Sequence, residues 1–274
     1  MQAPDILVYV HIPKCAGTAV RVWLRDAAVE GAITGFRALY PERHIYLPNE
    51  AWPSSNDARL VAVSSHNIRR YPPRLGARRL HYATILRDPR AQAISVLRYT
   101  QQERKAFGVP ASVGTASIDV ARWLLERTDG EPFENAQTNH IALHEWCDAA
   151  HGRVNPERYG SWPKRDRATY ERERLPLAKS LLQRFIMVGT AERPAESLHV
   201  LRARSAGIGL NLLPVDRVTV TNVTEIPEGD DISWIDRDPL GARLLESLAV
   251  DYELYAYGQT LLERALAEPN AEAV

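Results

Sequence analysis

The chain begins with a short run of apolar and β-branched residues, Asp5 to His11 (DILVYVH), which is typical of a strand buried on both faces. A Gly-containing loop follows. Helical spacing then places four apolar side chains on one face of residues 19–29: Val20, Trp23, Leu24 and Ala27. The pattern predicts a strand, a loop and a helix in direct succession. This unit constrains the fold most, because a strand followed by a covering helix belongs to a parallel sheet.

Strands and helices alternate along the rest of the chain. Three further apolar runs predict strands: Leu60–Ser64, His81–Leu86 and Arg184–Gly189. A capped helix is expected from Asp88-Pro89, and others at five ranges: 117–128, 134–147, 171–184, 194–206 and 239–266. We therefore expect one α/β domain of P-loop type over residues 1–274, with a central parallel sheet flanked by helices and with helical elaborations. Residues 148–170 are expected to form a surface loop or lid, and 267–274 a disordered tail.

Composition and charge exclude several classes of protein. Hydrophobic residues make up 45% and charged residues 25%, which excludes a disordered or fibrous chain. Lys+Arg and Asp+Glu both number 34, so the charge predicts no nucleic-acid partner and no adhesion to a membrane. No apolar run approaches the roughly 20 residues of a membrane span, and residues 1–10 lack a signal-peptide pattern. Two cysteines exclude a disulfide framework and a four-cysteine zinc site, so we expect a reduced, cytoplasmic protein.

Arginine is concentrated in one part of the chain. Between Arg59 and Arg104 there are ten arginines against two acids, Asp88 and Glu103. A local excess of this kind is typical of a site for phosphate, sulfate or carboxylate groups. The alternative interpretation is a solvated basic face.

The loop His11-Ile12-Pro13-Lys14-Cys15-Ala16-Gly17-Thr18 is the first candidate site. A Gly-containing turn between a strand and a helix points several backbone N–H groups at one place, where the helix dipole also favours an anion. Gly17 allows close approach, Thr18 offers a hydroxyl and Lys14 a mobile charge. The loop differs from the GxxxxGK[ST] pattern, because its lysine precedes the glycine. An ordinary strand-to-helix turn is the alternative.

The second candidate site is Leu86-Arg87-Asp88-Pro89 with Ser95, Arg98 and Tyr99 on the following helix. A guanidinium and a hydroxyl form an anion clamp if the strand end and the helix face one cavity. The alternative is a capped helix start without a ligand.

Together the two motifs, HIPKCAGT and LRDPRAQAISVLRY, resemble the nucleotide-binding motifs of sulfotransferases that use 3'-phosphoadenosine 5'-phosphosulfate (PAPS). The wording HIPK-x-x-GT is closest to the carbohydrate branch, which includes the uronyl and heparan 2-O-sulfotransferases. Further pieces fit that branch in order: Ser65-His66-Asn67, Asn135–Thr138, Val188–Glu192 with Glu196–Leu198, and Asp251–Tyr255. The resemblance spans residues 5–257.

The resemblance implies a role for each matching position. The 5'-phosphate and the sulfuryl group would be held by one run of residues: Lys14, Cys15, Ala16, Gly17 and Thr18. Arg87 and Ser95 would hold the 3'-phosphate. Ala16 stands where many relatives have a second glycine, and it fits the loop if its φ is negative. Cys15 stands at a variable position. Its place near a helix N-terminus can make a thiol acidic, but we expect no nucleophilic role, since sulfuryl transfer to a hydroxyl needs no covalent intermediate.

The chemistry requires a base for the acceptor hydroxyl and a positive group for the leaving phosphate oxygen. Lys14 suits the second task. His66 is our candidate base, because it follows a strand end at the edge where doubly wound sheets bind ligands, and because it matches the histidine of the resembled enzymes. A structural histidine is the alternative. Four other residues compete as the base: His11, His81, Glu50 and Asp57.

The expected ligands follow from this interpretation. PAPS would be the co-substrate and 3'-phosphoadenosine 5'-phosphate (PAP) the product, with no metal; His140 and His144 are spaced as metal ligands, but a packed or solvated pair is favoured. The acceptor would be a hydroxyl of a carbohydrate or small metabolite, oriented by Arg69 and Arg70 if it is anionic. Two alternatives stay open: a P-loop phosphotransferase using ATP, and a catalytically inactive nucleotide-binding module.

Overall fold

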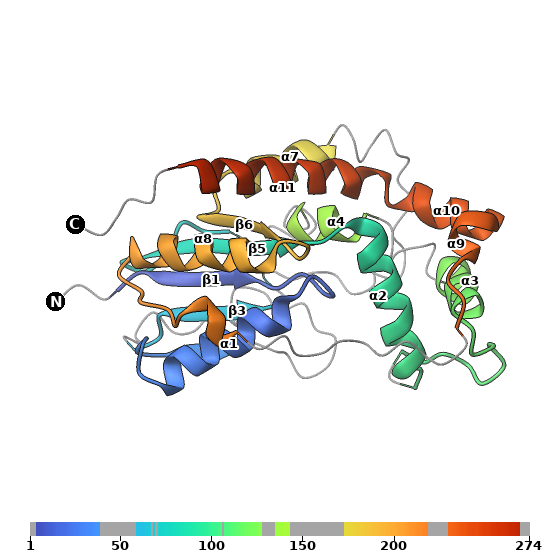
Figure 1. The fold of residues 1–274 in the computed structure, drawn as a ribbon, viewed down its shortest axis with the longest axis horizontal. Coiled ribbons are helices and arrows are strands. Elements are labelled where there is room, and N and C mark those ends of the chain that lie inside the picture. The colour runs from blue at the N-terminus through green and yellow to red at the C-terminus, as the bar shows by residue number, and fades with distance from the viewer. Residues whose placement is uncertain are drawn as a thin grey trace.

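A central sheet organises the computed structural model, which describes residues 4–38, 59–66, 68, 71–105, 107–127, 135–142, 173–218 and 230–268. Helices flank this sheet on both faces (Figure 1), as the sequence predicts for an α/β domain. The strands in these ranges are β1 Ile6–Val10, β2 Phe36–Ala38, β3 Ala62–Ser65, β4 Arg74–Leu75, β5 Arg78–Leu86 and β6 Met187–Thr190. The expected loop at 148–170 lies outside the described residues.

Five of the strands run parallel in the order β2-β3-β1-β5-β6, and the short β4 pairs antiparallel with the start of β5. β1 lies in the middle, where Val8 stands opposite Val63 and Tyr82. Every residue of β1 is fully buried, which explains its unbroken apolar sequence. The run predicted as a strand from Arg184 joins the sheet only at Met187.

The described helices are α1 Gly17–Val29, α2 Pro89–Gln102, α3 Ser117–Arg127, α4 Ala136–Ala142, α7 Leu175–Leu182, α8 Pro194–Ala206, α9 Trp234–Arg237, α10 Pro239–Ser247 and α11 Ala249–Ala267. α1, α2, α3 and α8 match their predicted positions. None of these helices is long and apolar enough to cross a membrane. The prediction of a tail from 267 is wrong at its first residue, because α11 includes Ala267, and 269–274 lie outside the described residues.

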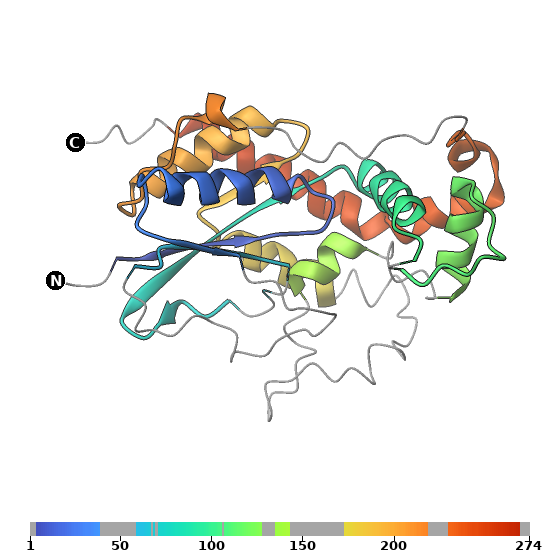
Figure 2. The same ribbon diagram turned by 90° about the horizontal axis from the view of Figure 1, so that it is seen from below.

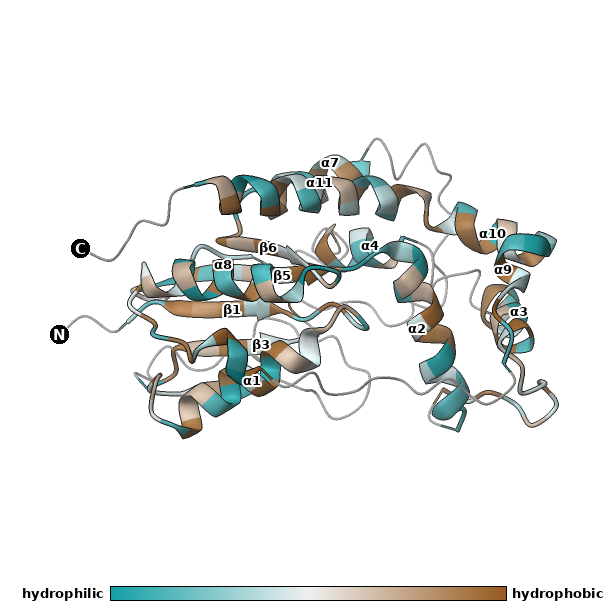
Figure 3. Ribbon diagram, viewed as in Figure 1, coloured by the Kyte–Doolittle hydropathy of each residue, from teal (hydrophilic) through white to brown (hydrophobic). Residues whose placement is uncertain are grey.

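α1 and α8 cover one face of the sheet, and α4 and α7 cover the other (Figure 2). α11 lies along the β6 edge and contributes Leu254 to one core cluster and Leu262 to the other. The hydropathy colouring separates the central strand from its covering helices: β1 is apolar, whereas α1 and α8 mix apolar and polar residues (Figure 3). The sheet is therefore buried on both sides, which a parallel sheet requires.

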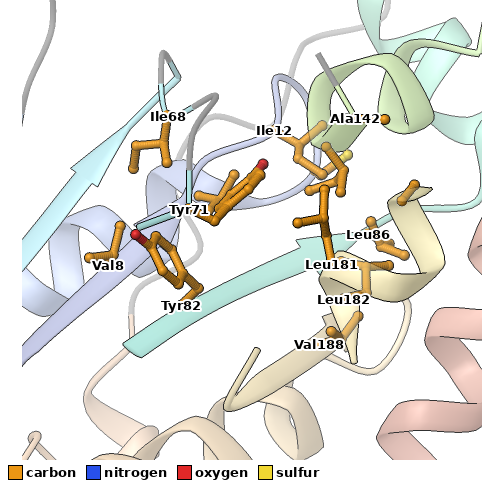
Figure 4. Packing of buried hydrophobic residues seen from close by; sticks show 14 of the residues in the cluster. Val8, Ile12, Ile68, Tyr71, Tyr82, Leu86, Ala142, Leu181, Leu182 and Val188 are labelled. Atoms are coloured by element: carbon orange, nitrogen blue, oxygen red, sulfur yellow. The ribbon is translucent and has the colours of Figure 1, made fainter. Parts of the chain in front are cut away.

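The core on the α4–α7 side reaches into the loop after β1 (Figure 4). Ile12 is 1% exposed and belongs to the same cluster as Leu86, Ala142 and Leu181. Burying an isoleucine side chain contributes about 1.5–3 kcal/mol. The loop is therefore anchored to the core at its second residue, before its polar part begins.

Four helices form a satellite unit beyond the carboxyl ends of the strands (Figure 1). α2, α3, α9 and α10 share a third apolar cluster, in which Leu97, Leu124 and Leu244 are buried. Trp234 donates an indole hydrogen bond to Ser117 Oγ at 2.9 Å within this unit. These are the helical elaborations that the sequence predicts.

The prediction of one helix over 239–266 is wrong, because the helix ends at Ser247 and a new one starts at Ala249. Asn135 occupies the break. Its N–H donates to Ser247 O at 2.9 Å, while its Oδ1 accepts from the N–H groups of Val250 (2.9 Å) and Asp251 (3.2 Å). Those two N–H groups therefore bond to a side chain rather than to carbonyls one turn earlier, and the helix is interrupted.

Asp251 in turn caps the N-terminus of α4 with its side chain. Its carboxylate accepts from Gln137 N–H at 2.9 Å, from Thr138 N–H at 2.8 Å and from Thr138 Oγ1 at 2.7 Å. Asn135 and Asp251 thus cap each other's helices across a sequence separation of 116 residues. Asp251 is 0% exposed, and desolvation raises its pKa to about 6 although these hydrogen bonds oppose the shift.

The buried carboxyl predicts a pH-dependent stability. The pKa of Asp251 is about 6 in the folded protein and 3.8 as its ordinary value, so the folded state binds this proton more tightly. The free energy of unfolding should then fall as pH rises from 4 to 7, by about 2–3 kcal/mol in total. Asp251→Asn removes this contribution. Urea unfolding at a series of pH values measures the free energy of unfolding of both proteins. The value for the wild type minus that for the variant should fall from pH 4 to pH 7. A difference that stays constant would contradict the prediction.

Candidate active site

The two sequence motifs meet at the carboxyl edge of the sheet. β1 and β5 are neighbouring parallel strands, so the loops that follow them start side by side at this edge, which is where doubly wound sheets bind ligands. Between these two loops the Arg87 Nη1 donates to the backbone oxygen of Lys14 at 2.9 Å. The structure therefore brings together the residues at 14–18 and Arg87, as the sequence predicts.

The loop after β1 takes a tighter path than expected. Lys14 and Ala16 both have left-handed backbones, with φ of 63° and 59°. The condition that Ala16 has a negative φ is therefore not met, and its conformation costs about 1–2 kcal/mol. The Cys15 N–H donates to Ile12 O at 3.3 Å, and this hydrogen bond stabilises the turn. Gly17 and Thr18 occupy the first turn of α1, where N–H groups have no partner inside the helix.

Gly17 is required by a close approach rather than by its φ. A Cβ at this position would lie 1.9 Å from Cδ2 of the His11 ring. The ring of His11 is itself 4% exposed and packs against the His66 ring at a centroid distance of 3.9 Å. Glycine therefore lets α1 begin directly against the His11 ring.

Cys15 points into the core. It is 0% exposed, and its Sγ lies 3.7 Å from Gln137 Oε1, to which it donates. Burial raises the thiol pKa well above its ordinary value, although the Arg87 charge opposes the shift. The suggestion that the helix N-terminus makes this thiol acidic is therefore wrong. Only the backbone of Cys15 belongs to the loop surface.

One face of α2 lies against the loop. Gln92 Nε2 donates to Pro13 O at 2.9 Å, and the Lys14 Nζ stands 4.2 Å from the centroid of the Tyr99 ring. Ser95 is three residues after Gln92 and four before Tyr99, so it shares their face of the helix. Burial and the neighbouring Arg87 lower the pKa of Lys14. Ser95 thus lies on the face of α2 that meets the loop.

Arg87 is half-buried and carries a charge that the described residues do not neutralise: no carboxylate among them forms an ion pair with it. Its backbone is held on both sides. Gln137 bonds to the N–H and the carbonyl of Arg87, and Glu192 Oε1 accepts from Asp88 N–H at 3.1 Å. The guanidinium therefore projects from a fixed backbone.

Glu192, which bonds to the residue after Arg87, belongs to another piece of the resemblance. Glu192 follows β6 and also accepts from Tyr255 Oη at 2.7 Å. Ser197 Oγ accepts from Thr190 N–H at 2.9 Å and fixes the end of β6. Sequence reasoning named these segments without assigning any role to them, because their contacts join distant parts of the chain.

His66 follows β3 directly and lies beside the loop. Its Nδ1 is 2.7 Å from the carbonyl oxygen of His11, and a carbonyl only accepts hydrogen bonds, so Nδ1 carries the proton. The neutral ring then has its basic lone pair on Nε2. This arrangement is the one that a general base requires, since the orientation and tautomer of the imidazole are both set by the backbone.

The competing bases are less suitable or lie elsewhere. Burial, with the nearby His66 and Arg21, lowers the pKa of His11 to about 2, so His11 is a weak base that shapes the loop. His81 bonds to Asp5 Oδ2 at 2.9 Å, five residues before the end of β5 and away from the carboxyl edge of the sheet. Four other residues that the sequence analysis named as candidates lie outside the described part of the chain: Glu50, Asp57, Arg69 and Arg70.

Within the described ranges, no group of three or more His, Cys, Asp or Glu side chains is arranged to hold a metal ion. His140 is 6% exposed on α4, and His144 lies outside those ranges.

No protein-family model matches the chain, and a search of curated proteins found no match either.

The left-handed backbone of Ala16 gives a test of the loop path. Glycine removes the Cβ penalty, so Ala16→Gly should raise the free energy of unfolding by about 0.5 kcal/mol after the entropy of the unfolded chain is counted. Ala19→Gly, three residues on and inside α1, should lower it by up to about 1 kcal/mol. Chemical denaturation of both variants measures the difference. If both variants lost the same free energy of unfolding, Ala16 would not have a positive φ.

Proposed function

We propose that the protein is a sulfotransferase that moves a sulfuryl group from PAPS to a hydroxyl of a carbohydrate or small metabolite. One observation supports the proposal above the others: the Arg87 guanidinium is hydrogen-bonded to the loop at Lys14. Two motifs, each with groups suited to an anion, are thus in direct contact. A nucleotide with phosphates at both its 5' and 3' positions matches such a pair.

The residues present fit such a donor. The N–H groups of Gly17 and Thr18, with the α1 dipole and the Lys14 ammonium, suit a 5'-phosphate. Arg87 offers a guanidinium without a carboxylate partner among the described residues, and Ser95 a hydroxyl on the facing helix. A 3'-phosphate suits this second pair, because guanidinium forks bind phosphate oxygens in two places.

His66 suits the role of general base. PAPS supplies a sulfur that a hydroxyl oxygen attacks as the S–O bond to the 5'-phosphate breaks. His66 Nε2 would accept the hydroxyl proton while Nδ1 keeps its hydrogen bond to His11 O, which stabilises the imidazolium as it forms. The electron pair of the broken bond stays on the phosphate oxygen. Lys14 and the first turn of α1 would stabilise that negative charge.

Nucleotide binding tests the donor. PAP and ADP carry the same number of phosphate groups, and only PAP has one at the 3' position. At concentrations about a hundred times its dissociation constant, PAP should stabilise the protein by about 2.7 kcal/mol, which is a rise in Tm of about 5 °C. ADP and ATP should stabilise it less.

Two arginines at the start of α2 provide the control for this measurement. Arg87→Ala should remove the advantage of PAP over ADP. Arg90→Ala should keep it, because Arg90 is bonded to Asp236 at 2.6 Å on the satellite unit. An equal response to PAP and ADP in the wild-type protein would refute the proposed donor, and stronger stabilisation by ATP would favour a phosphotransferase.

Turnover tests the two catalytic residues. With labelled PAPS and a panel of sugars and metabolites, His66→Ala and Lys14→Ala should each lower kcat by at least about a hundredfold. His66→Ala should keep part of its PAP binding. His81→Ala is the matched control, because this histidine bonds to Asp5 and should leave turnover unchanged. Near-normal turnover in His66→Ala would assign the base to another residue, whereas PAP binding without turnover on any acceptor would favour an inactive binding module.

A further inference from the structure

Arg87 stands one residue beyond the end of β5, where the ladder no longer supplies partners for its peptide groups. A single side chain replaces the ladder. Gln137 Oε1 accepts from Arg87 N–H at 2.9 Å, and Gln137 Nε2 donates to Arg87 O at 2.7 Å. The amide thus pairs with both polar groups of one residue, as a neighbouring strand would.

Gln137 is itself held firmly. It is 1% exposed, and its own N–H donates to the carboxylate of Asp251. Its Oε1 also accepts from the thiol of Cys15 in the loop after β1. This one buried residue therefore joins three parts of the chain: the loop after β1 and the end of β5 through its side chain, and the start of α11 through its backbone N–H.

The direction of the Arg87 side chain follows from this pairing. Two hydrogen bonds to one residue fix the rotation of its backbone, and with it the direction of the Cα–Cβ bond. The peptide between Arg87 and Asp88 is held at its other end as well, because Asp88 N–H donates to Glu192. The guanidinium then reaches Lys14 O from a backbone that cannot turn without leaving buried polar groups unsatisfied.

We propose that Gln137 is a positioning residue, which aims Arg87 at the 3'-phosphate and sets its distance from the loop that receives the 5'-phosphate. This inference rests on the proposed function. Gln137 touches no substrate atom, and its effect on binding passes through Arg87. Its loss should therefore weaken recognition of the 3'-phosphate far more than that of the rest of the nucleotide.

The affinity ratio of PAP over AMP isolates that effect, since the two nucleotides differ only in the 3'-phosphate. Gln137→Met keeps the length of the side chain and removes both hydrogen bonds to Arg87. Titration calorimetry should show the ratio falling at least about tenfold, with AMP affinity within about threefold of wild type. Gln137→Glu keeps an acceptor for Arg87 N–H but loses the donor to Arg87 O, so its ratio should also fall.

Thr138→Val is the matched control. It removes the hydroxyl bond to Asp251 from the adjacent residue and leaves both bonds of Gln137 to Arg87 in place. Its thermal stability should fall while its affinity ratio stays at the wild-type value. A general loss of stability would not move the ratio in either variant.

The outcomes separate the two proposals. A wild-type protein that does not prefer PAP over AMP refutes the proposed function and this inference with it. A wild-type preference that Gln137→Met retains, or a loss of PAP and AMP affinity in equal proportion, overturns the inference alone. If Gln137→Met does not fold, the same criteria apply to Gln137→Glu.

Discussion

The contact between the Arg87 guanidinium and the Lys14 carbonyl is the constraint on which the site depends. It joins the loops that follow two neighbouring strands, β1 and β5. The elements around it are arranged to keep its two ends in place. Ile12 anchors the loop in the core, while Gln137 and Glu192 fix the backbone on the other side. Buried groups therefore fix how the two loops lie relative to each other, which lowers the cost of ordering them around a ligand.

Much of the fold was predictable, because its signals are local. β1 is buried on both faces and its sequence is apolar throughout, while α1 repeats its apolar residues at helical spacing. Asp88 caps α2 by accepting from Ala91 N–H at 2.8 Å, as an Asp-Pro pair predicts. The order of strands and helices then restricts the topology to a parallel sheet, and the carboxyl edge of such a sheet identifies the side on which the site lies.

The features that sequence reasoning missed depend on residues far apart in the chain. The break between α10 and α11 at Leu248 is caused by Asn135, which lies more than a hundred positions earlier. The sequence around Leu248 contains no signal that predicts it. The tautomer of His66 is likewise set by the carbonyl of His11, 55 residues earlier. Gln137 was visible only as part of a motif piece, because an amide acquires its role from the backbone groups that it meets.

The bonds around Arg87 also bear on how the protein folds. They span 50 residues to Gln137, while Asp88 is bonded across 104 residues to Glu192 and Gln137 across 114 to Asp251. Contacts of such high order form late, since long loops must close before they are gained. A nascent chain can therefore form α1 long before the loops after β1 and β5 are joined at Lys14 and Arg87. The contact between these loops is then a late marker of completed folding.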